Sequence, residues 1–240
     1  MDIYAITIED AWFQSLFSLL DYGREYVVER GSFKGEKRIE FDWFKVKIMC
    51  AYQEPWDKML PKCPDGLDIP DPVAKGYVEE YVPYLMTGVK GEDEDYTYGE
   101  RLTRAKDVRL KPPYQEQDWV EFYVDQINYW IDELKKASKT NQAVLQIARP
   151  EDCLLDDPPC LRHIDMKVVE GRLIFYPYFR SWELWSGFPA NLAGIAVLQK
   201  YMADAIGIGL GEIVASSKGL HIYGYAEKIA RIRTYKQEVE

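Results

Sequence analysis

The sequence predicts a single α+β domain over residues 1–240. Helical stretches occur together with mostly non-alternating strands. The chain shows no internal repeat, no low-complexity segment and no convincing linker. Its 240 residues are 47% hydrophobic, which is enough to bury a substantial core and too apolar for a disordered chain.

The first half of the chain is expected to hold two helices and a bent strand. Residues 9–30 carry an apolar stripe at helical spacing. Residues 39–48 alternate as a strand does, but the apolar phase switches near Trp43, which predicts a β-bulge or a sharp kink. The proline-rich residues 52–76 are expected to form a surface loop, and residues 77–87 a short helix.

The second half is expected to contain two longer helices and several strands. Residues 118–136 form the clearest amphipathic pattern, with Asp118 as the N-cap. Pro189 is well placed to open a helix that runs to about Ile206 and is apolar on nearly all sides, so this helix is expected to be buried. The predicted strands are residues 143–147, 166–169, 173–179 and 214–222.

The charge and the N-terminus exclude several classes of protein. A net charge of -10 argues against non-specific nucleic-acid binding, which needs an excess of Lys and Arg. The N-terminus has no basic region followed by an apolar run, and the longest apolar stretches are shorter than a membrane span. We therefore expect a soluble, cytoplasmic protein that binds neither nucleic acid nor membranes.

The cysteines do not suggest a disulfide framework. There are four, irregularly spaced, in a chain that is long enough to build a core without them. A zinc site built from Cys153, Cys160 and His163 is an alternative, but its spacing matches no common zinc finger or ribbon. We therefore expect no metal.

Cys160 follows two prolines in the segment Asp156–His163. Proline fixes its own backbone and biases the preceding residue toward an extended conformation, so the thiol is expected on a stiff turn. An inert buried cysteine is the usual alternative. The turn alone leaves both a nucleophilic and a structural role open.

A second group of candidate residues follows a strand rich in aromatic residues. Arg180 and Ser181 together can bind a phosphate by charge and directed hydrogen bonds, although such arginines more often form surface ion pairs. The same positive charge would lower the pKa of a neighbouring thiol. Asn191 is most simply a helix cap, but its amide both donates and accepts, which suits the O4 and N3–H edge of a uracil.

His221 and Tyr223 stand two residues apart on a predicted strand and therefore share a face. A packed structural histidine is one interpretation. The functional interpretation is a pair of hydrogen-bond donors to a sugar hydroxyl.

In this order, the motifs resemble those of the thymidylate synthase family. The family pattern has a Pro-Cys turn, Arg-Ser, an acidic residue, Gly-x-Pro-x-Asn at the start of a buried helix, and a late His-x-Tyr. The corresponding residues here are Pro159-Cys160, Arg180-Ser181, Glu183, Gly187-Phe188-Pro189-Ala190-Asn191 and His221-Ile222-Tyr223. The joint match favours the nucleophilic role of Cys160.

The resemblance implies a kinked mixed sheet flanked by helices, a homodimer, and synthesis of dTMP from dUMP. By similarity, the Cys160 thiolate adds to C6 of the uracil, and C5 then receives a one-carbon unit and a hydride. The implied carrier is 5,10-methylene-tetrahydrofolate or a related methylene-tetrahydropterin. The implied binding residues are Arg180 and Ser181 for the phosphate, Asn191 for the uracil edge, His221 and Tyr223 for the 3′-hydroxyl, and Glu183 and Gly187 for the pterin.

The first half of the chain matches the family more loosely. Arg30 resembles its mobile phosphate-binding arginine, and Tyr98 resembles the tyrosine that orients the water that removes the C5 proton. The catalytic glutamate, which works on the O4 side through water, is expected shortly before Gly88. The ungapped register puts Tyr81 there, whereas a shift of one residue would put Glu80 there, and Glu80 is the residue that we predict.

Several family features are absent. Where the family has an arginine pair that reaches across the dimer to the phosphate, this chain reads Thr140-Asn141-Gln142. The tryptophans that usually pack near the folate are missing around residues 88–97, and the short apolar C-terminal tail is missing as well. Because these losses are concentrated on the carrier side, we predict a divergent, archaeal-type member that uses a modified folate such as a methanopterin.

Two alternatives remain open from the sequence. One is a dCMP hydroxymethylase of the same fold, a family that tends to carry Asp where Asn191 stands, because an acceptor is needed opposite the cytosine amino group. The other is a non-catalytic nucleotide-binding protein that kept the fold and lost the carrier site. Asn191 favours uracil over cytosine.

Overall fold

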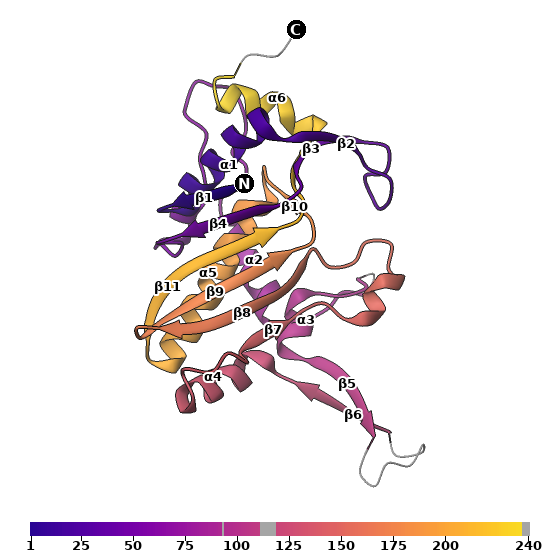
Figure 1. Ribbon diagram of the computed structural model, residues 1–240, viewed down its shortest axis with the longest axis vertical. Helices are drawn as coiled ribbons and strands as arrows, with labels where there is room; N and C mark the ends of the chain where they lie inside the picture. Colours follow the sequence, from indigo (N-terminus) through magenta and orange to yellow (C-terminus); the bar gives the residue numbers. More distant parts are fainter. Residues whose placement is uncertain (93, 111–118, 237–240) are drawn as a thin grey trace.

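The computed structural model of the chain describes residues 1–92, 94–110 and 119–236. The fold has two layers. One consists of β-sheets, and the other consists of helices that pack against the larger sheet (Figure 1). This arrangement confirms the predicted α+β class with mixed strands flanked by helices.

The larger sheet, within the described residues, has the strand order β1-β4-β11-β9-β8-β7. The strands are Asp2–Ala5 (β1), Phe44–Ile48 (β4), Gly209–Ser217 (β11), Arg172–Phe179 (β9), Leu161–Val169 (β8) and Val144–Gln146 (β7). Pairing is parallel between β1 and β4 and between β11 and β9, and antiparallel between the other neighbours. The sheet is therefore mixed, as predicted.

The smaller sheet has the order β10-β12-β3-β2, and short connections along the chain join it to the larger sheet. Its strands are Trp182–Glu183 (β10), Leu220–Tyr223 (β12), Lys37–Phe41 (β3) and Arg24–Val27 (β2). The predicted kink is the passage from β3 to β4. Phe41 and Phe44 are both buried and Trp43 between them is exposed, so the apolar phase switches where the chain changes sheets.

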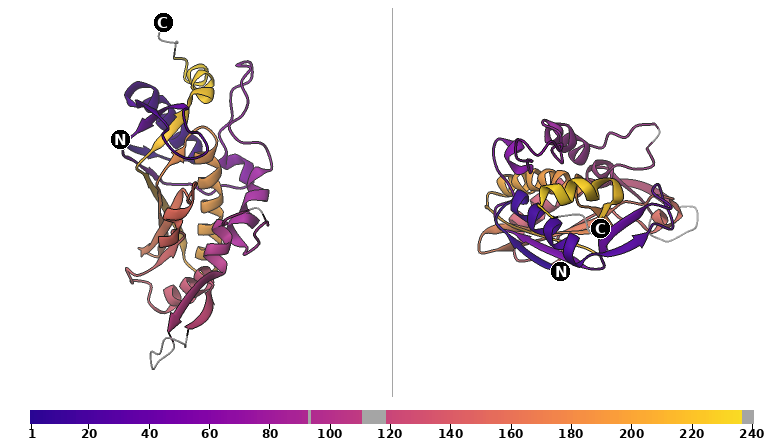
Figure 2. Two further views of the ribbon diagram at one scale, coloured as in Figure 1. Left: turned by 90° about the vertical axis from the view of Figure 1, so that its right-hand side faces the viewer. Right: turned by 90° about the horizontal axis from the view of Figure 1, so that it is seen from above.

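Helix α5 (Gly187–Ile206) is the central helix of the fold. It is buried on nearly all sides, as predicted, and lies between the larger sheet and helix α2 (Tyr77–Met86) (Figure 2). It ends at Gly207, whose φ of 87° is the left-handed conformation that glycine adopts without strain. The other helices are α1 (Ile8–Tyr22), α3 (Tyr98–Thr103), α4 (Gln126–Lys136), α6 (Gly224–Arg233) and the short 3₁₀ helices Trp56–Met59 and Pro150–Leu154.

The predicted helix over residues 9–30 is too long, because α1 ends at Tyr22 and the chain continues as β2. Gly23 stands at this transition in a crowded place. A Cβ atom there would lie 2.4 Å from Ile39 Cγ2. The pairing of β2 with β3 therefore overrides the apolar spacing that favoured a longer helix.

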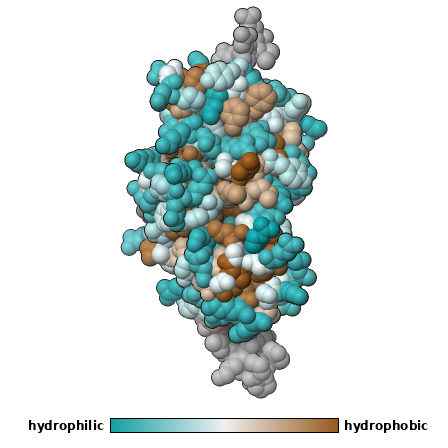
Figure 3. Space-filling model, turned by 90° about the vertical axis from the view of Figure 1, so that its left-hand side faces the viewer, coloured by the Kyte–Doolittle hydropathy of each residue, from teal (hydrophilic) through white to brown (hydrophobic). Residues whose placement is uncertain are grey.

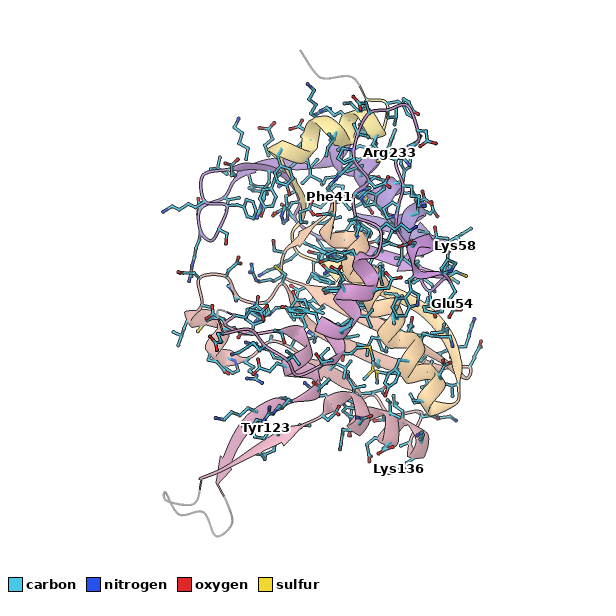
Figure 4. The ribbon with its side chains drawn as sticks, turned by 180° about the vertical axis from the view of Figure 1, so that it is seen from behind. Phe41, Glu54, Lys58, Tyr123, Lys136 and Arg233 are labelled. Carbon is cyan, nitrogen blue, oxygen red and sulfur yellow. The ribbon has the colours of Figure 1, made fainter. Side chains whose placement is uncertain are left out.

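The predicted helix over residues 118–136 is also wrong in its first part. Residues 119–124 form strand β6 (Trp119–Val124), which pairs with β5 (Ala105–Leu110) in a hairpin that projects from the body of the molecule (Figure 4). Helix α4 begins only after Asp125, whose carboxylate accepts the Asn128 amide at 3.0 Å. Asp118, the predicted N-cap, lies outside the described residues.

Candidate active site

The motif residues meet where β8 begins and β9 ends. These strands are antiparallel neighbours, so Cys160, directly before β8, lies beside Arg180, directly after β9. The Arg180 amide donates to the Cys160 carbonyl oxygen at 2.8 Å. The next strand, β10, pairs with β12, which brings His221 and Tyr223 to the same end of the sheets.

The side chain of Arg180 holds the turn that presents the thiol. Its Nε donates to the carbonyl oxygens of Pro158 and Pro159, at 3.1 and 3.2 Å. Its Nη2 lies 3.1 Å from Asp157 Oδ1, as an ion pair. The stiff turn predicted from the two prolines therefore has an arginine clamp as well.

The half-buried thiol of Cys160 experiences opposing influences. Burial raises its pKa, Arg180 and Arg162 lower it, and Asp157 raises it further, so that the pKa lies above its usual value. Of these influences, only that of Arg180 was predicted from the sequence. Arg180 favours the thiolate as expected, but its effect on the pKa does not outweigh that of burial.

Tyr98 contacts the residue next to the cysteine, because its hydroxyl accepts the Leu161 amide at 3.3 Å. Burial holds the pKa of this phenol well above 10.0. The neighbouring Gly99 permits this placement: a Cβ atom there would lie 2.1 Å from the Thr87 carbonyl oxygen. The Tyr-Gly pair thus lets α3 pack against the end of α2 while the phenol points toward Cys160.

Asn191, in α5, is held by two aromatic side chains. The indole Nε1 of Trp182 donates to its Oδ1 at 3.1 Å, and its Nδ2 donates to the hydroxyl of Tyr81 at 3.0 Å. An indole N–H can only donate, so the orientation of the amide is determined. Neither partner was predicted as a site residue, although the ungapped register had indicated Tyr81.

Glu80 does not take part in this group. Its side chain is exposed on α2, and the next residue, Tyr81, is the one that points toward Asn191. Neighbouring residues of a helix point about 100° apart, so both cannot face the site. The structure therefore places Tyr81 against Asn191, and the predicted Glu80 points away from it.

His221 is buried and has one free ring nitrogen. Its Nδ1 lies 2.9 Å from the carbonyl oxygen of Gly219, which can only accept, so Nδ1 carries the proton and Nε2 is an acceptor. This Nε2 is buried and has no hydrogen-bond partner among the residues that the structure describes. Burial, with Arg38 and Arg180 nearby, lowers the pKa of His221 to about 4. The ring of Tyr223 stands edge-on to it, with centroids 4.7 Å apart.

Arg30 approaches the cysteine turn from the loop after β2. It is exposed, and its guanidinium donates to the Leu155 carbonyl oxygen at 3.2 Å. In the same loop, the Ser32 hydroxyl donates to Asp157 at 3.0 Å. Ser181 is half-buried between β9 and β10. Two of the three predicted phosphate-binding residues thus follow each other after β9, and the third reaches the same turn from another loop.

Comparison with known proteins agrees with this geometry. The profile of the family "Thymidylate synthase" matches residues 54–238. The chain belongs to the thymidylate synthase family.

Relatives in this family match along most of their length. A protein of Methanococcoides burtonii named "Putative thymidylate synthase" is 31% identical over 234 residues, which cover 96% of this chain and 93% of that protein. Proteins with the same name from Methanosarcina barkeri and Methanothermobacter thermautotrophicus are 29% and 28% identical, over 93% and 90% of this chain and 89% and 90% of their own length. Thymidylate synthases in general methylate dUMP with a carrier of the methylene-tetrahydrofolate type.

Glu183, predicted to contact the pterin, caps α5. Its carboxylate accepts the amides of Trp185, Ser186 and Gly187, at 2.6, 2.8 and 2.8 Å. A negative charge is favourable at a helix N-terminus, and these bonds fix the first turn of the helix that carries Asn191.

A pocket of about 260 Å³ lies beside this cap, between α5 and the segment that leads into α2. Most of its lining residues are apolar, and the lining includes Tyr77 of α2 and Asn191 of α5. It is lined by Pro72, Val73, Ala74, Tyr77, Ser186, Gly187, Ala190 and Asn191. Gly187, the second residue predicted to bind the pterin, is thus on the wall of this pocket.

The described part of the chain has neither a cluster of metal-binding side chains nor a membrane-spanning helix. Among residues 1–92, 94–110 and 119–236, no three His, Cys, Asp or Glu side chains lie close enough together to hold a metal ion, so the zinc alternative gains no support. In the same residues, no helix is long and apolar enough to cross a membrane.

Proposed function

We propose that the protein is a thymidylate synthase that converts dUMP to dTMP, with Cys160 as the nucleophile. The observation that carries this proposal is the fixed orientation of the Asn191 amide. It stands near a half-buried thiol, an arginine clamp and an unpaired histidine acceptor.

The Asn191 amide matches uracil and not cytosine. Trp182 uses one acceptor site of Oδ1 and Tyr81 uses one hydrogen of Nδ2, which leaves one acceptor site and one N–H. Uracil offers O4 as an acceptor and N3–H as a donor, so both remaining positions are satisfied. Cytosine offers the opposite pattern and would require the amide to rotate, which would set an N–H against the Trp182 N–H.

The chemistry proposed for Cys160 begins with loss of its proton, which Arg180 and Arg162 favour. The thiolate forms a bond to C6, and the C5–C6 electron pair makes C5 a carbon nucleophile. A methylene-bearing reduced pterin supplies the one-carbon unit and the hydride. The hydroxyl of Tyr98, held next to Cys160, orients the water that takes the C5 proton before the sulfur leaves C6.

The remaining residues hold the nucleotide. We assign the phosphate to Arg30, Arg180 and Ser181, which combine two charges with a hydroxyl donor. The free Nε2 of His221 accepts from the 3′-hydroxyl of the deoxyribose, with the Tyr223 phenol beside it. A buried acceptor without a partner costs stability, and a ligand hydroxyl would remove that cost.

We propose that the pocket beside Asn191 takes the ring of the pterin. Its largely apolar walls and the Tyr77 ring suit a flat heterocycle, and Gly187 allows close approach at the start of α5. The carrier is a tetrahydrofolate or a modified folate such as a methanopterin. We further propose a cytoplasmic homodimer in which the helix-free face of the larger sheet forms the interface.

The test exchanges the group that reads the base. Release of tritium from C5-labelled dUMP and dCMP is measured for the wild type, for Asn191→Asp, and for Asn128→Asp, an exposed residue of α4, as the control. We expect the wild type and the control to act on dUMP, and Asn191→Asp to prefer dCMP by about 100-fold, since its acceptor suits the amino group.

Three results would contradict the proposal. A wild type that acts on dCMP and ignores dUMP would make the protein a hydroxymethylase. A wild type that binds dUMP but releases no tritium with any reduced pterin would make it a binding protein. Unchanged preference in Asn191→Asp would remove Asn191 from base recognition.

A further inference from the structure

Tyr81 is seated in a notch of the central helix. Gly194 lies nearly one turn after Asn191 on α5, and a Cβ atom at Gly194 would lie 2.6 Å from both Cδ1 and Cε1 of the Tyr81 ring. A glycine at this position therefore creates the space that the ring fills. α2 and α5 pack together here, and the phenol reaches across to the Asn191 amide.

The hydrogen bonds determine what the phenol can do. Trp182 fixes Oδ1 of Asn191 on its own side, so it is Nδ2 that faces Tyr81, and the Tyr81 oxygen must accept. The hydrogen of the phenol is then free to be donated elsewhere. No described side chain accepts it, so it remains available to a ligand that lies against Asn191.

We propose that Tyr81 is a catalytic residue that donates a hydrogen bond to O4 of the pyrimidine as Cys160 adds to C6. This proposal rests on the proposed function. As the S–C6 bond forms, the C5–C6 electron pair moves through C4 toward O4, where negative charge develops. The phenol keeps its proton throughout, so the step needs no further acid or oxidant.

The geometry supports a shared acceptor. The Tyr81 oxygen and Asn191 Nδ2 are 3.0 Å apart, and each has one hydrogen left to donate. Two donors so close together can both reach the same carbonyl oxygen, as paired donors do around a developing oxyanion. Tyr81 would thus do with a neutral phenol what the resemblance assigns to a carboxyl group acting through water.

The electrostatic surroundings keep the phenol protonated. Burial raises the pKa of Tyr81 well above its usual value, the rings of Tyr77 and Tyr84 on either side add to this, and the bond from Asn191 opposes it. The group is therefore a donor at every pH at which the protein would work. A carboxyl group at this place would change its charge in the acidic range instead.

The test removes only the hydroxyl. Tyr81→Phe is compared with Tyr84→Phe, a control that removes a hydroxyl one turn later on the same helix, from a ring stacked on Tyr81. Tritium release from C5-labelled dUMP is measured together with the Kd of dUMP and the alkylation rate of Cys160. We expect Tyr81→Phe to lose about 100-fold to 1,000-fold in tritium release, with Kd and alkylation within about threefold of the wild type.

A second variant keeps the Tyr81 hydroxyl but shifts the position of the ring that carries it. Gly194→Ala puts a methyl group against the ring, and we expect the same loss of tritium release with a retained Kd. If circular dichroism shows that Tyr81→Phe does not fold, Gly194→Ala tests the role of Tyr81 in its place.

The outcomes separate the two proposals. Tritium release by Tyr81→Phe within about threefold of the wild type would overturn the role of Tyr81 alone. An equal loss in Kd and rate would make the phenol a simple binding group, and would also overturn it. A wild type that does not act on dUMP at all would show that the proposed function fails, and the role of Tyr81 with it.

Discussion

At the scale of single residues, the reactivity of Cys160 depends on a competition for Arg180. The guanidinium stabilises the thiolate, but it also pairs with Asp157, which disfavours the thiolate. A phosphate bound at Arg180 would compete with the same carboxylate. We infer that Asp157 keeps the thiol less reactive until the nucleotide binds.

Removing the charge of Asp157 should activate the thiol. We expect Asp157→Asn to lower the pKa of Cys160 and to raise its alkylation rate by iodoacetamide about threefold to tenfold at neutral pH, because thiolate is the reactive form. Asp156→Asn is the matched control, since Asp156 is fully exposed and does not act on the thiol. Equal rates for both variants would contradict this account of Asp157.

His221 should make the stability of the fold depend on pH. Its pKa is lowered from 6.5 to about 4, so its contribution is fully present above pH 6.5 and is lost as the pH falls toward 4. The free energy of unfolding should therefore fall by on the order of 3 kcal/mol between these two pH values. Denaturant unfolding at several pH values should show a flatter dependence in this range for His221→Gln than for His163→Gln, and identical slopes would contradict it.

The site could be predicted in part because its motifs are local. Cys160, Arg180 and His221 each lie in a short segment whose order along the chain is informative. The link between Tyr81 and Asn191 joins residues 110 positions apart, so only the packing of α2 on α5 reveals it. For the same reason the sequence alone could not choose between Tyr81 and Glu80.

At the scale of elements, the sequence predictions were right where the pattern of apolar residues is compatible with one structure only. α5 was predicted to within about two residues, because burial on all sides leaves no other pattern, and the kink near Trp43 followed from the switch of apolar phase. The two helices that were predicted too long each include a stretch that is a strand in the structure. Residues 24–27 and 119–124 pair with distant strands, and this pairing overrides the helical spacing.

The contact between α2 and α3 should tolerate no side chain at Gly99. A Cβ atom there would lie 2.1 and 2.4 Å from the carbonyl oxygens of Thr87 and Tyr84, which are backbone atoms and cannot move independently. We expect Gly99→Ala to lower the free energy of unfolding by about 2 to 4 kcal/mol, measured by denaturant titration.

Gly91→Ala is the control for this substitution, because the nearest described atoms to its Cβ belong to the flexible side chain of Glu94, at 3.3 Å. A Gly99→Ala protein as stable as Gly91→Ala would mean that α3 does not pack on α2 as described.

At the scale of the whole molecule, one face of the larger sheet is covered by none of the described helices (Figures 1 and 2). Trp43 is 52% exposed on this face and lies near Tyr178, with ring centroids 6.2 Å apart. His163 lies on the other side of Tyr178, at 5.5 Å. Elsewhere on the surface, in the side view of Figure 3, apolar side chains lie in patches among polar ones. An aromatic cluster on an uncovered sheet face supports the proposed homodimer.

A charge in this cluster should separate the subunits. We expect the wild type to sediment at twice the 28.0 kDa of the chain, and Trp43→Glu to weaken the dimer by at least about 100-fold in Kd. Tyr22→Glu, at the exposed end of α1, should leave the dimer intact. A wild type that sediments as a monomer at all concentrations would contradict the proposed interface.

The central claim is that Cys160 forms a covalent bond to the uracil of dUMP. Its most direct test is release of tritium from C5-labelled dUMP by the wild type and by Cys160→Ser, with methylene-bearing tetrahydrofolate and tetrahydromethanopterin supplied in turn. We predict release by the wild type with at least one carrier, and a loss of at least about 1,000-fold in Cys160→Ser. Release by Cys160→Ser at the rate of the wild type would contradict the account.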